Sequence, residues 1–353
     1  MKHYLNCLIV GILFTFQSVA AQGLTGDTWA YVKKNKQGKI FAIHVNNAPF
    51  VYKKPDVEAA LGLEPDLLIE FSKFLQKKYG ISLEIEWKKL PSFRQMLETT
   101  RMSKNGVFGM AGISITDERK KVYGFSPAYM PDIEVIISSQ NVPLFSKISA
   151  FKAKLPSLKA ITVRNTTYEE NLKDLKKKFF PSLVYDFVPD GSSVMDSCMT
   201  QDNLWGYVSL PSYIEALNKG KKVERQHFFN VVREGVAIIY PLSSDWKEPM
   251  DEFFQQPDFQ QLVNQIINRH FGNFAADIIN DASKHTDDKN QERQISVMEQ
   301  KMNNILLQRE REKSEQKQTQ TMVAYLVLAS FLVLGGIAVW FFYHREKIKK
   351  RAR

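Results

Sequence analysis

The sequence predicts an α/β protein with two lobes. Between about Gly38 and Gly272, segments with the alternating apolar pattern of strands take turns with segments of helical spacing, which indicates strands and helices packed around a core. The 353-residue chain is long enough for two such lobes and for further segments. An apolar run opens the chain, and a polar segment followed by a second apolar run closes it.

The chain opens with the pattern of an export signal. Lys2 precedes an apolar run that closes with the small residues Ala20 and Ala21, as a cleaved secretory signal does. The sequence therefore predicts a signal peptide over 1–21 and an N-terminal segment over 22–37. An uncleaved anchor is the alternative, and the shortness of the apolar run argues against it.

The first part of the α/β region reads as strand, helix, strand, helix and strand, with the second helix over 91–102. Residues 40–45 are strand-like, and residues 66–79 carry apolar side chains at helical spacing up to Gly80, which suits the position just past a helix end. Residues 81–87 then alternate between apolar and polar, as a half-buried strand does. A strand over 107–113 would deliver the residues after it to the same sheet edge as the loop that follows the first strand.

The alternation continues in the second part of the region. Strands predicted over 160–163 and 204–209 are each followed by a predicted helix, over 168–180 and 211–217. Further along, the strand-like segment GVAIIYP precedes a helix predicted over 251–271. This organisation favours a folded α/β protein over a fibre or a disordered chain.

The most informative stretch is GISITDERKKVYGFSPAYMP, residues 112–131. Ser114 and Thr116 place hydroxyls just before a predicted helix start, two acidic residues suit the positive end of that helix, and Arg119 follows in its first turn. Free backbone N–H groups at a helix start favour negative charge, and a guanidinium binds a carboxylate with two parallel hydrogen bonds. The stretch therefore predicts a site for an anionic group.

The order Ile-Thr-x-x-Arg followed by Phe-Ser-Pro-x-Tyr in this stretch resembles the signature of family 3 extracellular solute-binding proteins, the amino-acid-type periplasmic receptors. The resemblance spans about residues 38–272. It implies the type 2 periplasmic-binding-protein fold, in which the ligand lies between two lobes that close about a hinge of two crossing strands. It also implies a discontinuous lobe one, over 38–140 and 233–282, with lobe two inserted over 141–232.

The resemblance implies ligand-binding residues from both lobes, namely Phe50, Gly112, Ser114, Arg119, Thr166 and Thr167. Phe50 would form an aromatic wall against the ligand, and Arg119 would pair with a ligand carboxylate. Gly112 and Ser114 would present backbone and hydroxyl groups to that carboxylate, and the two threonines would cap it from lobe two. Asn165 stands where the family usually has a glycine before these threonines, and asparagine tolerates the positive φ that such a turn requires.

Each of these residues also has a purely structural interpretation. Phe50 follows a proline and suits core packing equally well. Arg119 could pair with one of the two acids before it, and the motif favours a ligand partner over that surface pair. One of the two threonines is expected only to cap the following helix.

The sequence departs from the family pattern where the ligand's ammonium is usually held. Amino-acid binders of the family place an acid after the strand that corresponds to 204–209, and this chain has Ser209, Leu210 and Pro211 there. An ammonium buried without a partner would cost several kcal/mol. We therefore expect an anionic or peptide-like ligand, unless Asp190 or another nearby acid such as Glu215 replaces the missing one.

A polar segment over 283–321 follows the α/β region. It is rich in Gln, Lys and Glu and has no Pro or Gly, which favours a helical stalk. Ile295, Met298, Met302 and Ile305 follow a three-four spacing, and Arg309 interrupts it soon after. The pattern predicts either a short coiled coil that forms a homodimer or a lone solvated helix, with a slight preference for self-association.

The run that follows is apolar from end to end. Residues 322–343 are about as long as a bilayer core requires, so they predict a transmembrane helix. The basic tail over 344–353 then predicts a cytoplasmic C-terminus by the positive-inside rule. Together with the signal peptide, these features predict a single-pass protein of the inner membrane with a periplasmic, extracytoplasmic binding domain.

Other functions have weaker support in the sequence. The net charge of +10 is partly the basic tail, and no basic stripe for nucleic acid is visible. His44, His227 and His270 lack the spacing of metal ligands, and Cys198 is left without a partner for an intramolecular disulfide once the signal is removed. We expect no metal, no cofactor and no catalytic residue.

The sequence thus predicts a membrane-anchored solute-binding protein for a small anionic or peptide-like ligand. It would either hand the ligand to a membrane-embedded permease or report occupancy to a signalling protein. Three alternatives remain: a sensing adaptor, a cleft enzyme of the dehydratase type, and a degenerate binding fold that serves as a scaffold. Uptake that fails on deletion would indicate transport, and a lost transcriptional response with intact uptake would indicate sensing.

Overall fold

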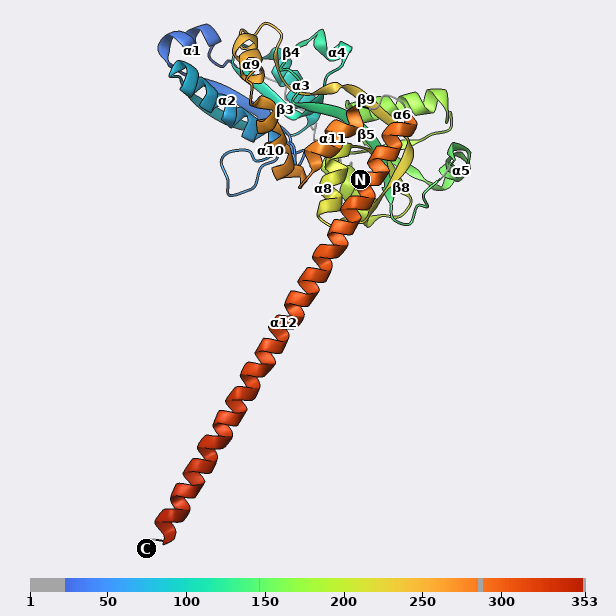
Figure 1. Cartoon of the computed structure of the whole chain (residues 1–353). Coiled ribbons are helices and arrows are strands. Elements are labelled where there is room, and N and C mark those ends of the chain that lie inside the picture. The colour runs from blue at the N-terminus through green and yellow to red at the C-terminus, as the bar shows by residue number, and fades with distance from the viewer. Residues whose placement is uncertain (1–22, 146, 285–287, 352–353) are drawn as a thin grey trace, which may run out of the picture.

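The computed structural model describes residues 23–145, 147–284 and 288–351. The predicted signal peptide lies outside these residues. Two lobes lie side by side, and one long helix extends away from them (Figure 1). The two-lobed α/β fold that the sequence predicts is therefore confirmed.

The lobes share a sheet whose strand order is β2-β1-β3-β9-β5-β8-β6-β7, and β4 pairs with β9 at one side. The nine strands in the described part of the chain are β1 (Gln37–His44), β2 (Ser82–Lys89), β3 (Val107–Ser114), β4 (Tyr123–Phe125), β5 (Met130–Ser139), β6 (Lys159–Val163), β7 (Tyr185–Val188), β8 (Leu204–Ser209) and β9 (Val223–Pro241). In lobe one, β1 pairs with β2 and β3 in parallel, and in lobe two, β6 pairs with β7 and β8 in parallel.

Strands β5 and β9 connect the two lobes. The end of β9 pairs with β3 of lobe one, while its residues 223–236 pair with β5, which in turn pairs with β8 of lobe two. The β5–β9 register shifts twice, between Met130 and Asp132 and between Glu134 and Ile136. These two irregular antiparallel strands are the crossing strands that the family resemblance implies.

Helices cover the sheet in both lobes (Figure 1). Those of lobe one and its edge are α1 (Trp29–Asn35), α2 (Leu63–Tyr79), α3 (Phe93–Met102), α4 (Asp117–Lys120), α9 (Lys247–Phe254) and α10 (Phe259–Phe271). Those in or against lobe two are α5 (Ile148–Lys154), the 3-10 turn η1 (Leu155–Ser157), α6 (Thr167–Lys178), α7 (Gly191–Thr200), α8 (Leu210–Asn218) and α11 (Ala275–Ser283). The α10–α11 corner contacts α8, so one side of the inter-lobe region is packed.

Helix α2 shows why the spacing of apolar residues predicted a helix here. Its apolar stripe, including Leu68 and Phe71, is buried, and Phe71 packs edge-on against Trp246 at 6.2 Å between ring centroids. Gly80 ends the helix with φ of 68°, a conformation that favours glycine. The predicted helix over 66–79 and its stop are confirmed.

The helix predicted over 251–271 is wrong as a single element. The chain forms α9 and α10 instead, and the interruption contains Pro257. Proline lacks the N–H that an interior helical position donates, and its ring clashes with the preceding turn. The short helices α1, α5 and α7 and the short strand β7 were not predicted from the sequence.

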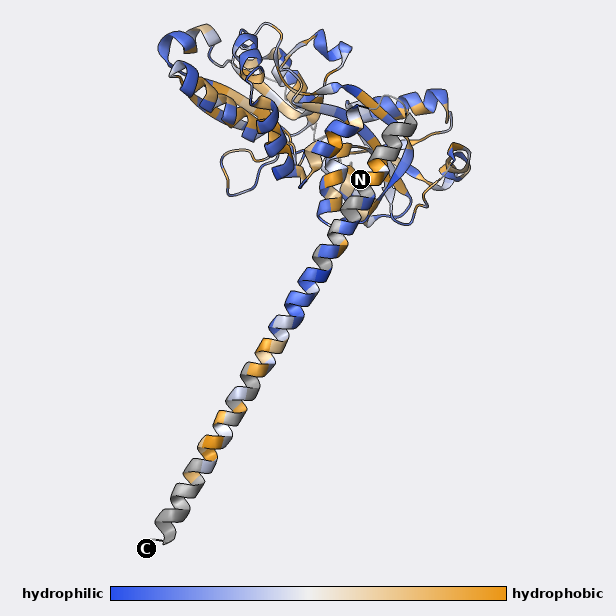
Figure 2. Cartoon of the chain, in the orientation of Figure 1, coloured by the Kyte–Doolittle hydropathy of each residue, from blue (hydrophilic) through white to orange (hydrophobic). Residues whose placement is uncertain are grey.

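Helix α12 (Asp288–Arg351) runs through the predicted stalk and the predicted membrane span as one helix. Near its start, Ile295 is buried against the domain, and the rest extends away from the lobes (Figure 1). Along the extended part, a polar stretch precedes an apolar one (Figure 2). Within the residues that the structure describes, no helix is long and apolar enough to cross a membrane. The predicted transmembrane helix over 322–343 is therefore not confirmed, and the stalk dimer stays a prediction.

Candidate functional site

A cleft between the lobes brings together all six residues that the sequence singled out, namely Phe50, Gly112, Ser114, Arg119, Thr166 and Thr167. They come from the loop after β1, from the end of β3 with the turn after it, and from the start of α6. The cavity measures about 140 Å³. Their roles toward a ligand stay predictions.

Arg119 reaches the cleft from α4, a single turn of helix. Thr116 caps this turn, because its hydroxyl accepts a hydrogen bond from the Arg119 backbone N–H at 3.3 Å. The guanidinium donates to the Ser114 carbonyl oxygen at 3.1 Å through Nη1 and to the Asn165 carbonyl oxygen at 3.5 Å through Nη2. It also lies 5.6 Å from the centre of the Phe93 ring.

The charge of Arg119 has no ion-pair partner in the described parts of the chain. Its nearest hydrogen-bond acceptors are carbonyl oxygens, and Asp117, one of the two acids before it, lies 3.8 Å from Lys120 instead. Burial lowers the pKa of the guanidinium, yet an arginine stays protonated at neutral pH. A carboxylate that entered the cleft could therefore form an ion pair with the Arg119 guanidinium.

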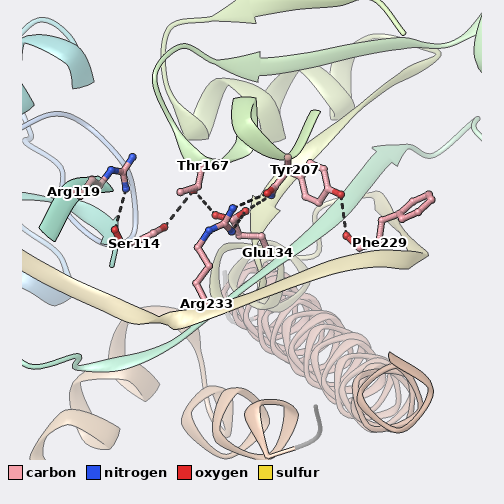
Figure 3. Close-up of polar contacts among 8 residues, drawn as sticks. Ser114, Arg119, Glu134, Thr167, Tyr207, Phe229 and Arg233 are labelled. Carbon is pink, nitrogen blue, oxygen red and sulfur yellow. Dashed lines mark hydrogen bonds and ion pairs between the residues drawn. The ribbon is translucent and has the colours of Figure 1, made fainter. Parts of the chain in front are cut away.

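Ser114 and Thr167 join the two lobes across the cleft. Their hydroxyl oxygens lie 3.3 Å apart, and the Thr167 hydroxyl donates a hydrogen bond to Glu134 on β5 (Figure 3). The Thr166 hydroxyl donates to the Val163 carbonyl oxygen at 2.6 Å, so it makes no side-chain cap bond to α6 although Thr166 holds the cap position. In this conformation the two lobes are therefore in contact across the cleft.

The turn before α6 forms as predicted, although asparagine replaces glycine. Asn165 has φ of 64°, a left-handed conformation that asparagine tolerates better than most residues. Its backbone N–H donates to the Glu169 carboxylate at 2.7 Å. This turn presents the Asn165 carbonyl oxygen to Arg119 and so helps to join the lobes.

Phe50 and Gly112 form one wall of the cleft. Gly112 has φ of 66°, and a Cβ atom at this position would lie 2.9 Å from the Phe50 ring. Phe50 also packs edge-on against Phe271 at 5.1 Å between ring centroids. The sequence left core packing and ligand contact open for Phe50, and the structure places it in both settings, buried in the core and on the cleft wall.

The Gly112 backbone N–H is already used within the protein. It donates to both carboxyl oxygens of Glu64, each at 3.1 Å, and the Tyr129 hydroxyl donates to Glu64 at 2.9 Å. Glu64 is fully buried, and this burial raises the pKa of its carboxyl group to about 8, against the effect of the two hydrogen bonds. Sequence analysis missed Glu64, because an acid in the first turn of a helix is usually an exposed, dipole-stabilising residue.

No acid occupies the position after β8, as the sequence indicated. Ser209 lines the cleft and caps α8, and its hydroxyl accepts from the Ser212 backbone N–H at 3.2 Å. Glu215 is not among the lining residues and pairs with Lys219 instead. Asp190 does line the cleft, and its Oδ1 caps α7 by accepting from the backbone N–H and the hydroxyl of Ser193, each at 2.8 Å.

A second buried acid lines the cleft from the crossing strand β5. Asp132 is 3% exposed, and its Oδ2 has no hydrogen-bond partner among the described residues. Burial, followed by the charge of Glu134, raises the pKa of Asp132 to about 7. The sequence signal that could have found it is the pair of acids two residues apart in the otherwise apolar strand MPDIEVII.

Glu134 belongs to a buried polar cluster beside the cleft (Figure 3). Its carboxylate lies 2.8 Å from Arg233 Nη1 of β9 and accepts hydrogen bonds from Thr167 and Asn171. Arg233 also donates to the Asn171 Oδ1 atom at 2.7 Å. Burial raises the pKa of Glu134, and the Arg233 charge opposes this rise. The cluster ties β5, β9 and α6 together.

The described part of the chain holds no group of three or more His, Cys, Asp or Glu side chains that could bind a metal ion. His44 is buried at the end of β1, and burial lowers its pKa to about 4. Cys198 is buried in α7, and burial raises the pKa of its thiol to about 12.

The family model of bacterial extracellular solute-binding proteins, family 3, matches residues 40–308. The chain therefore belongs to this family, which is one of binding proteins and which the sequence motif had indicated. The match spans both lobes, the inter-lobe cleft and the first part of α12.

Solved structures with the same fold include ligand-binding domains. The GluR0 ligand-binding core from Nostoc punctiforme, in complex with L-glutamate, is 19% identical with a TM-score of 0.51, over 66% of this chain and 99% of that chain. The arginine-, lysine-, histidine-binding protein ArtJ from Geobacillus stearothermophilus is 20% identical with a TM-score of 0.50, over 66% and 95%. The AvGluR1 ligand-binding domain in complex with glutamate is 13% identical with a TM-score of 0.53, over 72% and 97%. These likenesses show the fold alone.

Proposed function

We propose that this protein binds a small carboxylate-bearing ligand between its lobes, with Arg119 as the partner of the carboxylate. The observation that carries the proposal is the Arg119 guanidinium, which lies in the cleft beside two carbonyl oxygens and without an ion-pair partner among the described residues. A cation in such a setting attracts a carboxylate, which accepts two parallel hydrogen bonds from a guanidinium. Single amino acids and small peptide-like carboxylates both belong to the class that we propose.

Ligand binding would favour the closed arrangement of the lobes. Ser114 and Arg119 belong to lobe one, and each already contacts lobe two, at Thr167 and Asn165. A carboxylate held at this point would accept hydrogen bonds from groups of both lobes. Because the open form would lose part of these bonds, the ligand would shift the population toward closure.

The proposed role is delivery of the ligand to a membrane-embedded permease or a report of its presence to a signalling protein. The family is extracellular, so we place the binding domain outside the cytoplasm. Deleting the gene and measuring both uptake of the ligand and the transcriptional response to it would separate the two roles. Lost uptake would indicate transport, and a lost response with normal uptake would indicate sensing.

We also propose that α12 attaches the binding domain to a membrane. The supporting observation is a row of strongly exposed apolar side chains on this helix, such as Leu326, Leu332 and Val339. Exposed apolar surface of this extent favours burial in lipid or against a partner. We expect the full chain to remain in the membrane fraction after an alkaline wash, and a chain that ends at Ser283 to be released. Recovery of the full chain in the supernatant would contradict attachment.

The carboxylate site can be tested by binding to the full chain. We expect at least one of the twenty L-amino acids, small dicarboxylates or dipeptides to raise the unfolding midpoint, since a ligand at a hundredfold excess over Kd stabilises the folded state by about 2.7 kcal/mol. Arg119→Ala should weaken binding by about 2–5 kcal/mol, because it removes one partner of a buried charge pair. The control is Arg94→Ala, which removes an exposed arginine that pairs with Glu98. Equal binding by Arg119→Ala and the wild type would contradict the proposed site.

A further inference from the structure

An acid in the wall of the cleft has a buried oxygen without a hydrogen bond. Asp132 Oδ2 is shielded from solvent and has no hydrogen-bond partner in the described residues, while the residue itself lines the cavity. Buried carboxylate oxygens are normally bonded, because a lone charge out of water is unfavourable. An acid in the wall of a binding cleft that keeps such an unbonded oxygen is suited to a donor that arrives with the ligand.

The neighbouring charges do not neutralise Asp132. Glu134 lies two residues along the same strand and takes the Arg233 ion pair at 2.8 Å, together with the hydrogen bonds of Thr167 and Asn171. The charges of Arg233 and Arg119 act on Asp132 more weakly than burial and the repulsion of Glu134 do, so the pKa of Asp132 is raised rather than lowered. Among the described residues, no Lys or Arg forms an ion pair with Asp132.

The second acid of the cleft is arranged differently. One oxygen of Asp190 accepts two hydrogen bonds from Ser193, so this carboxylate caps α7. Asp132 caps no helix. Of these two lining acids, Asp132 is the one with a fully buried oxygen that lacks a donor.

The acid is also adjacent to the proposed carboxylate site. Ser114 lies between the two, since its carbonyl oxygen accepts a hydrogen bond from Arg119 and its side chain lowers the pKa of Asp132. A cationic group at Asp132 would therefore lie close to an anionic group at Arg119. This spacing suits a ligand that carries both charges near one another.

We propose that Asp132, on the crossing strand β5, binds a cationic group of the ligand and takes the place of the acid that is absent after β8. This inference rests on the proposed carboxylate site at Arg119. The two residues together make the cleft complementary to a zwitterion with an ammonium group close to its carboxylate. Because β5 connects the lobes, the ammonium would bind beside the hinge rather than at the start of α8.

The first test uses pairs of compounds that differ only in the ammonium group. L-glutamate is compared with glutarate, L-arginine with 5-guanidinopentanoate, and L-methionine with 4-(methylthio)butanoate, and all twenty L-amino acids are screened to choose further pairs. Binding to the full chain is measured by calorimetry at neutral pH. We expect the amino acid of the binding pair to bind about a hundredfold or more tightly than its deaminated partner. Equal affinities within the pair would overturn the inference and would leave the carboxylate site intact.

The second test changes the acid. Asp132→Asn keeps the shape of the side chain and removes its charge, so it should weaken the amino acid about a hundredfold and leave the deaminated partner within a few-fold. Asp190→Asn is the matched control, since it makes the same change in the same cleft at a residue that serves as a helix cap, and it should preserve the preference for the amino acid. An unchanged preference in Asp132→Asn would overturn the inference.

Two further outcomes are decisive. If no carboxylate of either kind binds the wild type, the proposed function and this inference fail together. If deaminated carboxylates bind as well as or better than amino acids, and Arg119→Ala abolishes their binding, only the inference fails. The wild-type comparison of each pair requires no variant, so it decides the question even if Asp132→Asn does not fold.

Discussion

Replacing Glu64 by glutamine would change the pH dependence of stability. The Glu64 side chain is fully buried, where it accepts hydrogen bonds from the Gly112 backbone and the Tyr129 hydroxyl. Burial raises the pKa of its carboxyl group from an ordinary value near 4.5 to about 8. The folded protein therefore keeps a proton on Glu64 at neutral pH, whereas the unfolded chain releases it. Glutamine has nearly the same shape and no ionisation.

The sign and size of the effect follow from the two pKa values. Because the folded-state pKa is the higher one, the contribution of Glu64 to stability is fully present below pH 4.5 and is lost as the pH rises toward 8. Each pH unit in this interval costs up to about 1.4 kcal/mol, so the full loss is about 5 kcal/mol. Above pH 8 the loss is complete and no longer grows. Glu64→Gln should show none of this loss.

The assay is urea unfolding of the full chain at pH 5, 7 and 9, followed by tryptophan fluorescence. Trp29 and Trp246 are buried in the core cluster that contains α2, so their emission reports on this part of the fold. Relative to the wild type, Glu64→Gln should gain stability at each step from pH 5 to pH 9. Glu70→Gln is the control, because Glu70 lies near the surface of the same helix and pairs with Lys73. Parallel pH profiles for the wild type and Glu64→Gln would refute the reasoning.

Three further predictions concern the backbone and the thiol. Gly112→Ala should destabilise the fold by about 1–3 kcal/mol in the same assay, because φ is 66° and the new Cβ would lie 2.9 Å from Phe50. An unchanged urea midpoint would contradict the expected strain at this position. Asn165→Ala should cost about 1 kcal/mol, and Asn165→Gly should be neutral or stabilising, since the turn has φ of 64°; equal effects of the two substitutions would show that φ does not matter here. In the chain without its signal peptide, Cys198 should react slowly with a thiol reagent until urea is added, because the thiol is buried and its pKa is raised to about 12. Rapid reaction of Cys198 in the folded protein would be evidence against this burial.

The elements of the fold were predictable where the pattern is local. Alternation of apolar and polar residues located β2, helical spacing located α2, and Gly80 marked its end, and the structure confirms all three. The helix predicted over 251–271 failed because its spacing continues across Pro257, and the missing N–H matters more than the spacing.

The candidate site was predictable only in part. The motif around Ser114 and Arg119 could be read because its residues are close in sequence, and the structure places them on one cleft wall. Asp132 and Glu64 were missed as cleft and backing residues, since an acid in a strand or a first helical turn is exposed in most proteins. Their burial depends on elements that pack from elsewhere in the chain.

By itself, the sequence determined the α/β order, the family and a set of residues that the structure gathers at one cleft, because periodicity, turn chemistry and short motifs are local properties. Only the tertiary structure decided which buried charges are paired. Asp132 and Glu134 stand two residues apart on one strand and look alike in the sequence, yet Arg233 of β9 pairs with Glu134. The other acid is left beside the cleft with an unbonded oxygen. The register places Arg233 opposite Asp132, and its guanidinium reaches diagonally to Glu134 instead. Which acid it pairs with depends on packing between strands far apart in the sequence, and no local pattern encodes that packing.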